Sequence, residues 1–159
     1  MLVNIAVKML DLEFRVIIAE DNKFMRNECV ELIKNIFINY FRKNGLEIEE
    51  DLIYIEEVEE GRSLIDSVKK NEYHFILTDY DLLDKTNGLD AIIEIKEYER
   101  KQSRDTPIVL MSGYDEESDL VRKAKKAGIK AYIEKATIDF EEELTRILEE
   151  VVGDYYELR

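Results

Sequence analysis

The chain has 159 residues, of which 45% are hydrophobic and 38% are charged, a composition typical of one globular domain rather than of a disordered chain. Its 37 acidic and 23 basic residues give a net charge of −14, which weighs against direct binding to the phosphate backbone of DNA or RNA. A single cysteine, Cys29, excludes a disulfide framework and a cysteine-rich metal site and fits a reducing compartment, so we expect a cytoplasmic protein.

The first 14 residues are apolar-rich but are interrupted by Asn4, Lys8 and Asp11. They lack the features of a signal peptide, and no stretch of the chain reaches the ~20 apolar residues that span a bilayer. We therefore interpret residues 1–14 as an N-terminal arm and expect no contact with a membrane. Five short runs of β-branched and aromatic residues follow, typical of strands buried on both faces of a parallel sheet. They are Arg15–Ala19, Leu52–Ile55, His74–Thr78, Pro107–Met111 and Ala131–Ile133.

Segments with helical spacing separate these runs, the first marked by apolar residues from Met25 to Tyr40 and the last by those from Phe140 to Val151. Gly45 and Gly128 follow two of the helices, where a left-handed cap favours glycine. The pattern is (βα)5, which predicts a doubly wound α/β domain with a parallel five-stranded sheet. We assign residues 15–152 to this domain and residues 153–159 to a C-terminal tail.

Polar residues stand where the predicted strands end, and ligands of open α/β sheets bind at that edge. Glu20 and Asp21 follow the first strand, and Asp79 ends the third with Asp81 close behind. Carboxylates that crowd one pocket need a cation, and oxygen ligands with open water positions suit Mg²⁺ or Mn²⁺.

Two later strands add a hydroxyl and an ammonium group at the same edge. Ser112 ends the fourth strand and Lys135 follows the fifth. A metal ion and a lysine beside one carboxylate form a place for a phosphoryl group, with the carboxylate as nucleophile. Each residue alone has a plainer interpretation: Asp21 as a helix cap, Asp79 as a turn residue, Lys135 as a surface lysine. Their occurrence together favours function.

The chain resembles the receiver domain of bacterial two-component response regulators in the segments VIIAED, FILTDYDLLDKTNGLDAI, IVLMSGYD and AYIEKA. The resemblance implies a flavodoxin-like sheet with strand order 2-1-3-4-5. It also implies that Asp79 is the phosphoacceptor and that Asp21 and Asp79 ligate Mg²⁺ directly, with the backbone carbonyl of Asp81. Glu20 would act through a water molecule.

By the same resemblance, Lys135 contacts the phosphoryl group, Ser112 is the switch hydroxyl, and Tyr132 is the aromatic residue that turns inward. Asp81 and Tyr114 would flank the path of the hydrolytic water and tune the lifetime of the phosphoryl group. Asp81 could orient that water, whereas the bulky Tyr114 should shield the phosphorus, so we expect slow self-dephosphorylation.

The chain departs from the family pattern at several positions. Ala136 replaces the proline that usually follows the lysine, which leaves open whether the Lys135–Ala136 peptide is cis, because a cis bond to alanine costs ~3–4 kcal/mol. The segment before the second strand is long and predicts a helix from Lys23 to Asn44. The far end of this helix is unusually apolar, and we consider that it binds a partner or a second copy, or else thickens the core. Its apolar residues are Ile36, Phe37, Ile38, Tyr40 and Phe41.

We therefore expect a signalling switch that catalyses only its own phosphorylation and dephosphorylation. A sensor histidine kinase or a histidine phosphotransfer protein would supply the phosphoryl group, and a downstream protein would bind the altered surface. The residues after Lys135 hold one helix and a short tail rather than an output domain. The starting Met1 and the tail Tyr155–Arg159 favour a stand-alone receiver over a fragment of a longer regulator or hybrid kinase. The alternative of another class is a phosphatase like the haloacid dehalogenases, which would use Asp79 and Asp81. The single histidine, His74, opens a strand and is not expected to be a phosphodonor.

Overall fold

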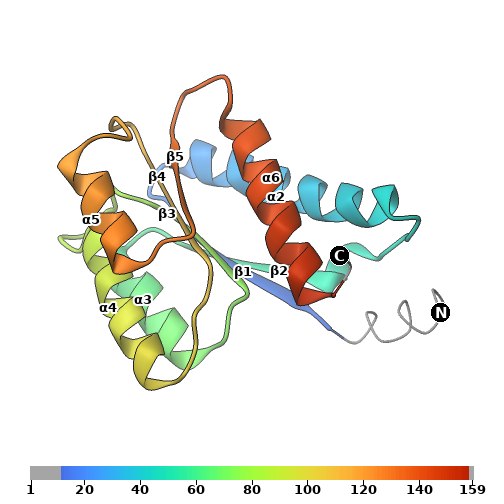
Figure 1. Cartoon of the computed structure of the whole chain (residues 1–159), viewed down its shortest axis with the longest axis horizontal. Coiled ribbons are helices and arrows are strands. Elements are labelled where there is room, and N and C mark those ends of the chain that lie inside the picture. Colours follow the sequence, from blue (N-terminus) through green and yellow to red (C-terminus); the bar gives the residue numbers. More distant parts are fainter. Residues whose placement is uncertain (1–11, 158–159) are drawn as a thin grey trace.

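The protein folds around one sheet of five parallel strands (Figure 1), as seen in a computed structural model that describes residues 12–157. The strand order is β2-β1-β3-β4-β5, which confirms the predicted flavodoxin-like arrangement. Residues 1–11 of the predicted arm and residues 158–159 of the predicted tail lie outside the described residues. The strands are β1 (Phe14–Ala19), β2 (Ile53–Val58), β3 (Phe75–Asp79), β4 (Ile108–Ser112) and β5 (Ala131–Glu134). The helices are α2 (Lys23–Lys43), the 3-10 helix η1 (Glu50–Leu52), α3 (Gly61–Lys70), α4 (Gly88–Lys101), α5 (Asp119–Ala127) and α6 (Phe140–Tyr155).

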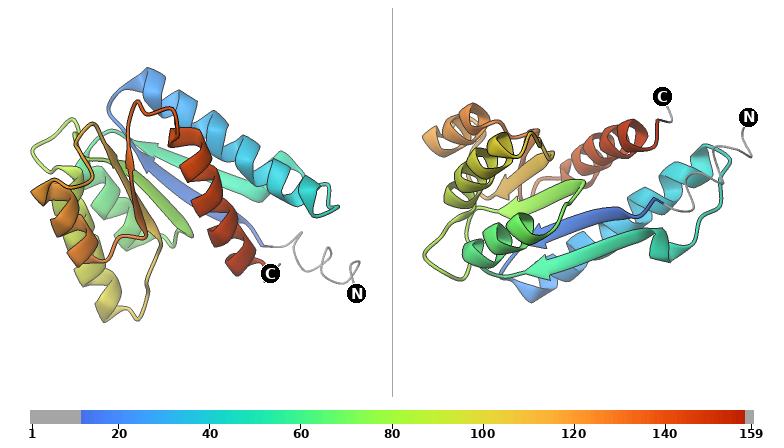
Figure 2. Two further views of the ribbon diagram at one scale, coloured as in Figure 1. Left: turned by 45° about the horizontal axis from the view of Figure 1, so that its top comes forward. Right: turned by 90° about the horizontal axis from the view of Figure 1, so that it is seen from below.

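Helices cover both faces of the sheet, as the right-handed crossovers between parallel strands require (Figure 2). α3, α4 and α5 lie on one face, and α2 and α6 lie side by side on the other. Every residue of β3 and β4 is buried, because each of these central strands is covered from both sides. The carboxyl ends of all five strands meet at one edge, where Asp79 and Ser112 are the last residues of their strands.

The observed boundaries differ by a few residues from those predicted. β1 begins at Phe14, which we had placed in the arm, and α6 continues to Tyr155, into the segment we had placed in the tail. Leu52 belongs to the 3-10 helix η1, and β2 instead extends to Val58 through acidic residues. β2 is an edge strand, so its outer side chains reach water and charged residues are tolerated there.

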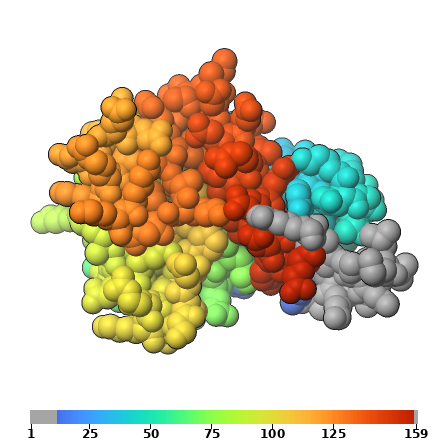
Figure 3. Space-filling view, in the orientation of Figure 1, coloured from blue at the N-terminus to red at the C-terminus, as the bar shows by residue number. Residues whose placement is uncertain are grey.

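The long helix predicted before the second strand is confirmed as α2, which ends one residue before the predicted end. Its apolar far end packs within the same chain, since Ile36, Phe37 and Phe41 are buried, and Ile38 and Tyr40 are half-buried. α6 packs beside this end of α2, which stands next to it in Figure 3. The apolar excess therefore thickens the core, and the hypothesis of a partner surface built on these side chains is wrong for the three buried ones.

Two glycines meet specific steric demands. Gly128 ends α5 in the left-handed region with φ of 102°, as its position predicted. Gly88 begins α4 directly against the end of β3, where a Cβ atom would lie 2.1 Å from the backbone oxygen of Asp79. A side chain at position 88 would thus displace the backbone of Asp79 itself.

Candidate phosphoacceptor site

Three carboxylates meet at the carboxyl edge of the sheet. Glu20 and Asp21 follow β1, and Asp79 ends the adjacent strand β3. One oxygen from each of the three lies within 4.8 Å of the others. Glu20 and Asp79 are buried, whereas Asp21 is exposed at the mouth of the cluster. The structure thus brings together the acids predicted to ligate a metal, and their hard oxygen donors fit Mg²⁺ or Mn²⁺.

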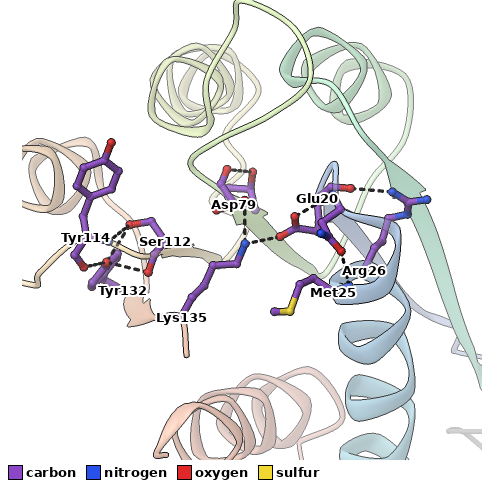
Figure 4. A network of polar contacts seen from close by, with 10 residues as sticks. Glu20, Met25, Arg26, Asp79, Ser112, Tyr114, Tyr132 and Lys135 are labelled. Atoms are coloured by element: carbon purple, nitrogen blue, oxygen red, sulfur yellow. Dashed lines mark hydrogen bonds and ion pairs between the residues drawn. The ribbon is translucent and has the colours of Figure 1, made fainter. Parts of the chain in front are cut away.

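Lys135 reaches into this cluster from the turn after β5. Its Nζ lies 2.7 Å from Glu20 Oε2 and 2.9 Å from Asp79 Oδ2 (Figure 4). The backbone N–H of Lys135 donates to the carbonyl of Ser112 at 2.7 Å, which ties the turn after β5 to the end of β4. The ammonium group therefore occupies a position where a cation neutralises two buried carboxylates.

The charges of this cluster depend on one another. Burial raises the pKa of Asp79 and of Glu20, and the hydrogen bonds from Lys135 oppose that rise. Burial would lower the pKa of Lys135, but its hydrogen bonds to the two carboxylates prevail and raise it. The pocket accordingly favours positive charge beside Asp79, which is what an incoming phosphoryl group requires.

The helix cap beside the cluster is Asn22 and not Asp21. The Asn22 side chain accepts a hydrogen bond from the N–H of Met25 at 3.0 Å, and its own N–H donates to Glu20 Oε1 at 3.0 Å. The plainer interpretation of Asp21 as a cap is therefore wrong. The carboxylate of Asp21 instead belongs to the cluster, together with those of Glu20 and Asp79.

Ser112 and Tyr132 form a second group beside the acids. Tyr132 comes from β5 and is buried, with its hydroxyl 2.9 Å from Ser112 Oγ. The same hydroxyl donates to the carbonyl of Tyr114, and the N–H of Tyr114 donates to Ser112 Oγ at 3.0 Å. The predicted switch residues thus lie in contact, with Tyr132 on the inside of the molecule.

The remaining predicted residues lie at the rim. Asp81 is exposed and is not part of the cluster of three carboxylates, but its charge contributes to the raised pKa of Asp79. Tyr114 packs edge-on against Tyr80, with the ring centroids 5.5 Å apart. No cis peptide bond occurs within residues 12–157, so the Lys135–Ala136 bond is trans, and Ala136 has a positive φ of 60°.

Sequence reasoning missed two residues that hold the loops of the site. Arg26, in the first turns of α2, donates to the carbonyl of Glu20 at 2.8 Å. Asp84, in the loop between β3 and α4, accepts hydrogen bonds from the N–H groups of Gly61 and Arg62 at 2.8 and 3.0 Å. A signal for Arg26 was present, because it follows the cap residue by about one helical turn and the segment Glu56–Glu60 is rich in acids without a cation.

Comparison with known proteins decides the family. The family model described as the response regulator receiver domain matches residues 16–149. The chain belongs to the response regulator receiver domain family. It is thus a receiver domain of the phosphorelay type, and the haloacid-dehalogenase-like alternative is set aside. Among residues 12–157, no helix is both long enough and apolar enough to cross a membrane.

Individual relatives of this receiver are distant. Histidine kinase CKI1 of Arabidopsis thaliana is 24% identical over 129 residues, which are 73% of this chain but only 11% of that protein. One similar solved structure is the receiver domain of the sensor histidine kinase PA1611 from Pseudomonas aeruginosa, which holds a magnesium ion in its active-site cleft. It is 20% identical with a TM-score of 0.66, and the match covers 89% of this chain and 98% of the PA1611 chain. The chemotaxis protein CheY4 of Vibrio cholerae is 16% identical with a TM-score of 0.62 over 87% of this chain and 98% of its own. These structures share the fold.

Proposed function

We propose that this receiver accepts a phosphoryl group on Asp79 from a phosphohistidine of a sensor kinase or a phosphotransfer protein. The observation that carries the proposal is the position of the Asp79 carboxylate, which lies 2.9 Å from Lys135 Nζ and within 4.8 Å of oxygens of Glu20 and Asp21. A buried carboxylate that contacts a cation and lies near two further acids is equipped for phosphoryl transfer.

The reaction is an in-line displacement at phosphorus. A carboxylate oxygen of Asp79 forms the new O–P bond while the N–P bond to the donor imidazole breaks, and the departing nitrogen keeps the electron pair and takes up a proton. Charge spreads over the equatorial phosphoryl oxygens in the transition state, and the ammonium group of Lys135 is placed to neutralise part of it. The chain would thus catalyse only its own modification and its reversal.

The acid cluster is suited to a divalent cation. Glu20, Asp21 and Asp79 would hold Mg²⁺ or Mn²⁺, joined in the family pattern by the backbone carbonyl of Asp81. All of these donors are oxygen atoms, which such hard ions prefer. The bound ion would supply positive charge to the phosphoryl oxygens during transfer.

Signalling would follow from the contact between Ser112 and Tyr132. A phosphoryl group on Asp79 presents new acceptor oxygens, and the Ser112 hydroxyl can turn to them only by giving up its bonds to the Tyr132 hydroxyl and the Tyr114 N–H. Phosphorylation would therefore bias the position of Tyr132 and of the loop after β4. A downstream protein that distinguishes the two arrangements then reads the signal by population shift.

The donor protein would dock beside the site on two exposed apolar side chains. Phe24 at the start of α2 is 71% exposed and Ile138 before α6 is 97% exposed. Both line a groove of about 530 Å³ that also includes Ala136, the residue after Lys135. A helix that presents a phosphohistidine at this groove would lie beside the turn that carries Lys135, the partner of Asp79. Replacing Phe24 and Ile138 with serine should slow transfer from a protein donor but leave transfer from a small-molecule donor unchanged.

The central test is the intact mass of the protein after incubation with Mg²⁺ and phosphoramidate, a donor with an N–P bond. We expect one phosphoryl group on the wild type, none on Asp79→Asn, and none when the divalent cation is chelated. Asp81→Asn removes the same charge two residues away and should retain the labelling. Modification of Asp79→Asn to the wild-type extent would refute the assignment.

A further inference from the structure

Arg26 connects three parts of the molecule around the acid cluster. Its side chain is only 11% exposed, and one of its terminal nitrogens donates to the backbone carbonyl of Glu20 at 2.8 Å (Figure 4). The same guanidinium group lies 3.2 Å from Glu57 at the end of β2 and 3.1 Å from Glu59 in the following loop. Arg26 thus holds the end of β1 against the end of β2 from a position on α2.

We propose that Arg26 is a positioning residue that sets the affinity of the acid cluster for a divalent cation by fixing the peptide between Glu20 and Asp21. This inference rests on the proposed metal-dependent function. The geometry of that peptide decides where both carboxylates point, because the carbonyl that Arg26 holds belongs to the bond that joins the two acids.

Every polar group of Glu20 has a fixed partner. Its N–H donates to the carbonyl of Val58 at 3.0 Å, its carbonyl accepts from Arg26, and its carboxylate accepts from Asn22 and Lys135. The exposed Asp21 follows directly, so the Glu20 carbonyl is the nearest anchored atom on its N-terminal side. Loss of the Arg26 bond would leave the peptide between Glu20 and Asp21 without a direct hydrogen bond on its carbonyl, held only through the neighbouring N–H groups of Glu20 and Asn22.

The positive charge of Arg26 is offset by two neighbouring acids. Glu57 and Glu59 both pair with the guanidinium group, so the three side chains together carry a net negative charge. Removal of that positive charge would be expected to strengthen cation binding by simple electrostatics, whereas loss of orientation would weaken it. The two effects have opposite signs, which allows an experiment to separate them.

The lysine variant is informative because it keeps the charge. The guanidinium group is a rigid planar fork with five donors, which can serve a carbonyl and two carboxylates at once. The ammonium group of a lysine is a single point on a flexible stem, and it cannot hold all three partners in the same geometry. Orientation is therefore lost in Arg26→Lys and in Arg26→Met, and charge is lost only in the second.

The experiment measures binding of Mn²⁺ by the electron paramagnetic resonance signal of the free ion. Circular dichroism checks that each variant is folded under the same conditions. We expect both Arg26→Lys and Arg26→Met to bind Mn²⁺ about tenfold more weakly than the wild type, the effect typical of groups that orient metal ligands. Asp21→Asn should lose most binding. Arg62→Met, which removes an exposed arginine that pairs with Glu94, should bind as the wild type does.

Two results would overturn the inference while the proposed function stands. Tighter binding by Arg26→Met with unchanged binding by Arg26→Lys would mean that only charge matters. Unchanged affinity in both variants with a lower melting temperature would mean that Arg26 only ties α2 to β2. If Arg26→Met does not fold, Arg26→Lys alone decides, because its charge is conserved. Absence of Mn²⁺ binding by the wild type would overturn both this inference and the proposed metal site.

Discussion

The hydroxyl of Tyr132 lies 2.9 Å from Oγ of Ser112 and joins the edge strand β5 to the end of β4. Burial raises the pKa of Tyr132, so the hydroxyl keeps its proton and can donate. It donates to the carbonyl of Tyr114, in the loop that follows β4, so Ser112 Oγ is the donor in the bond between the two hydroxyls. One buried side chain thereby holds both the hydroxyl of Ser112 and the loop that follows β4.

Replacement of Tyr132 with phenylalanine should loosen this loop. The variant removes only the hydroxyl, which leaves Ser112 Oγ and the Tyr114 carbonyl each without one partner, and we expect the free energy of unfolding to fall by about 1 kcal/mol. Urea unfolding measures this change. The control is Tyr54→Phe, since Tyr54 is 43% exposed on β2 and the substitution keeps the ring that lies under Arg15. Equal stability of Tyr132→Phe and the wild type would contradict the role of the hydroxyl.

A second prediction concerns pH and the opposite edge of the sheet. His74 Nδ1 accepts a hydrogen bond from the N–H of Arg15 at 2.9 Å, which requires that this nitrogen carry no proton. Burial lowers the pKa of His74, Arg15 lowers it further, and the nearby Glu72 and Glu13 only partly oppose this. The ring also packs against Tyr155 with centroids 4.2 Å apart, so the neutral form is well accommodated.

The sign of the effect follows from the depressed pKa. The unfolded chain binds a proton on His74 more readily than the folded chain, so stability is fully present above the unfolded pKa of about 6.5 and is lost as the pH falls through the folded value. We expect the contribution of His74 to the free energy of unfolding to decrease as the pH falls below about 6.5. His74→Asn, whose amide oxygen can replace Nδ1, should show a weaker decrease. Parallel profiles for the two proteins would refute the prediction.

The sheet was predictable because its strands are buried from both sides. β3 and β4 contain only buried residues, and such continuous apolar runs stand out in a sequence. The ends of β2 were less predictable, because Leu52 lies in η1 and the acidic residues Glu56 and Glu57 nonetheless pair with β1. Propensity cannot show that pairing, which depends on the neighbouring strand.

The charged residues at the centre of the site were predictable from the strand pattern, whereas the residues that hold its loops were not. Glu20, Asp79 and Lys135 meet because parallel strands end at one edge. Arg26 and Asp84 reach their partners across elements that are distant in the chain, and such contacts depend on how helices are placed on the sheet. A sequence shows the charges of these residues but not which partners they meet.

A third prediction tests Asp84 as the anchor of the loop between β3 and α4. Its carboxylate accepts the N–H groups of Gly61 and Arg62 at the start of α3, a helix whose own cap residue makes no side-chain cap bond. Asp84→Ala should therefore cost about 1 kcal/mol in the free energy of unfolding, the usual effect of a lost cap. Asp66→Ala, which removes an exposed acid from α3 itself, should cost much less.

The pH dependence gives this prediction a second readout. Burial opposes ionisation of Asp84, but hydrogen bonds from backbone N–H groups prevail and lower its pKa. The contribution of Asp84 is therefore present above the unfolded pKa of about 3.9 and is lost as the pH falls through the lower folded value. The stability difference between wild type and Asp84→Ala, measured by urea unfolding, should shrink in acid. A constant difference across that range would argue against the ionic cap.

The last prediction concerns the lifetime of the phosphoryl group. Hydrolysis needs a water molecule in line behind the phosphorus, and Tyr114 is positioned to restrict that path because its ring, 48% exposed, packs on Tyr80 beside Asp79. We expect self-dephosphorylation of the wild type over many minutes or longer. Tyr114→Asn should open the path and add an amide that orients water, which we expect to accelerate decay about tenfold, or ~1.4 kcal/mol of barrier. Decay after removal of the donor measures both rates, with Tyr54→Asn as the control, and wild-type decay within seconds or slower decay of Tyr114→Asn would show that Tyr114 does not shield the phosphorus.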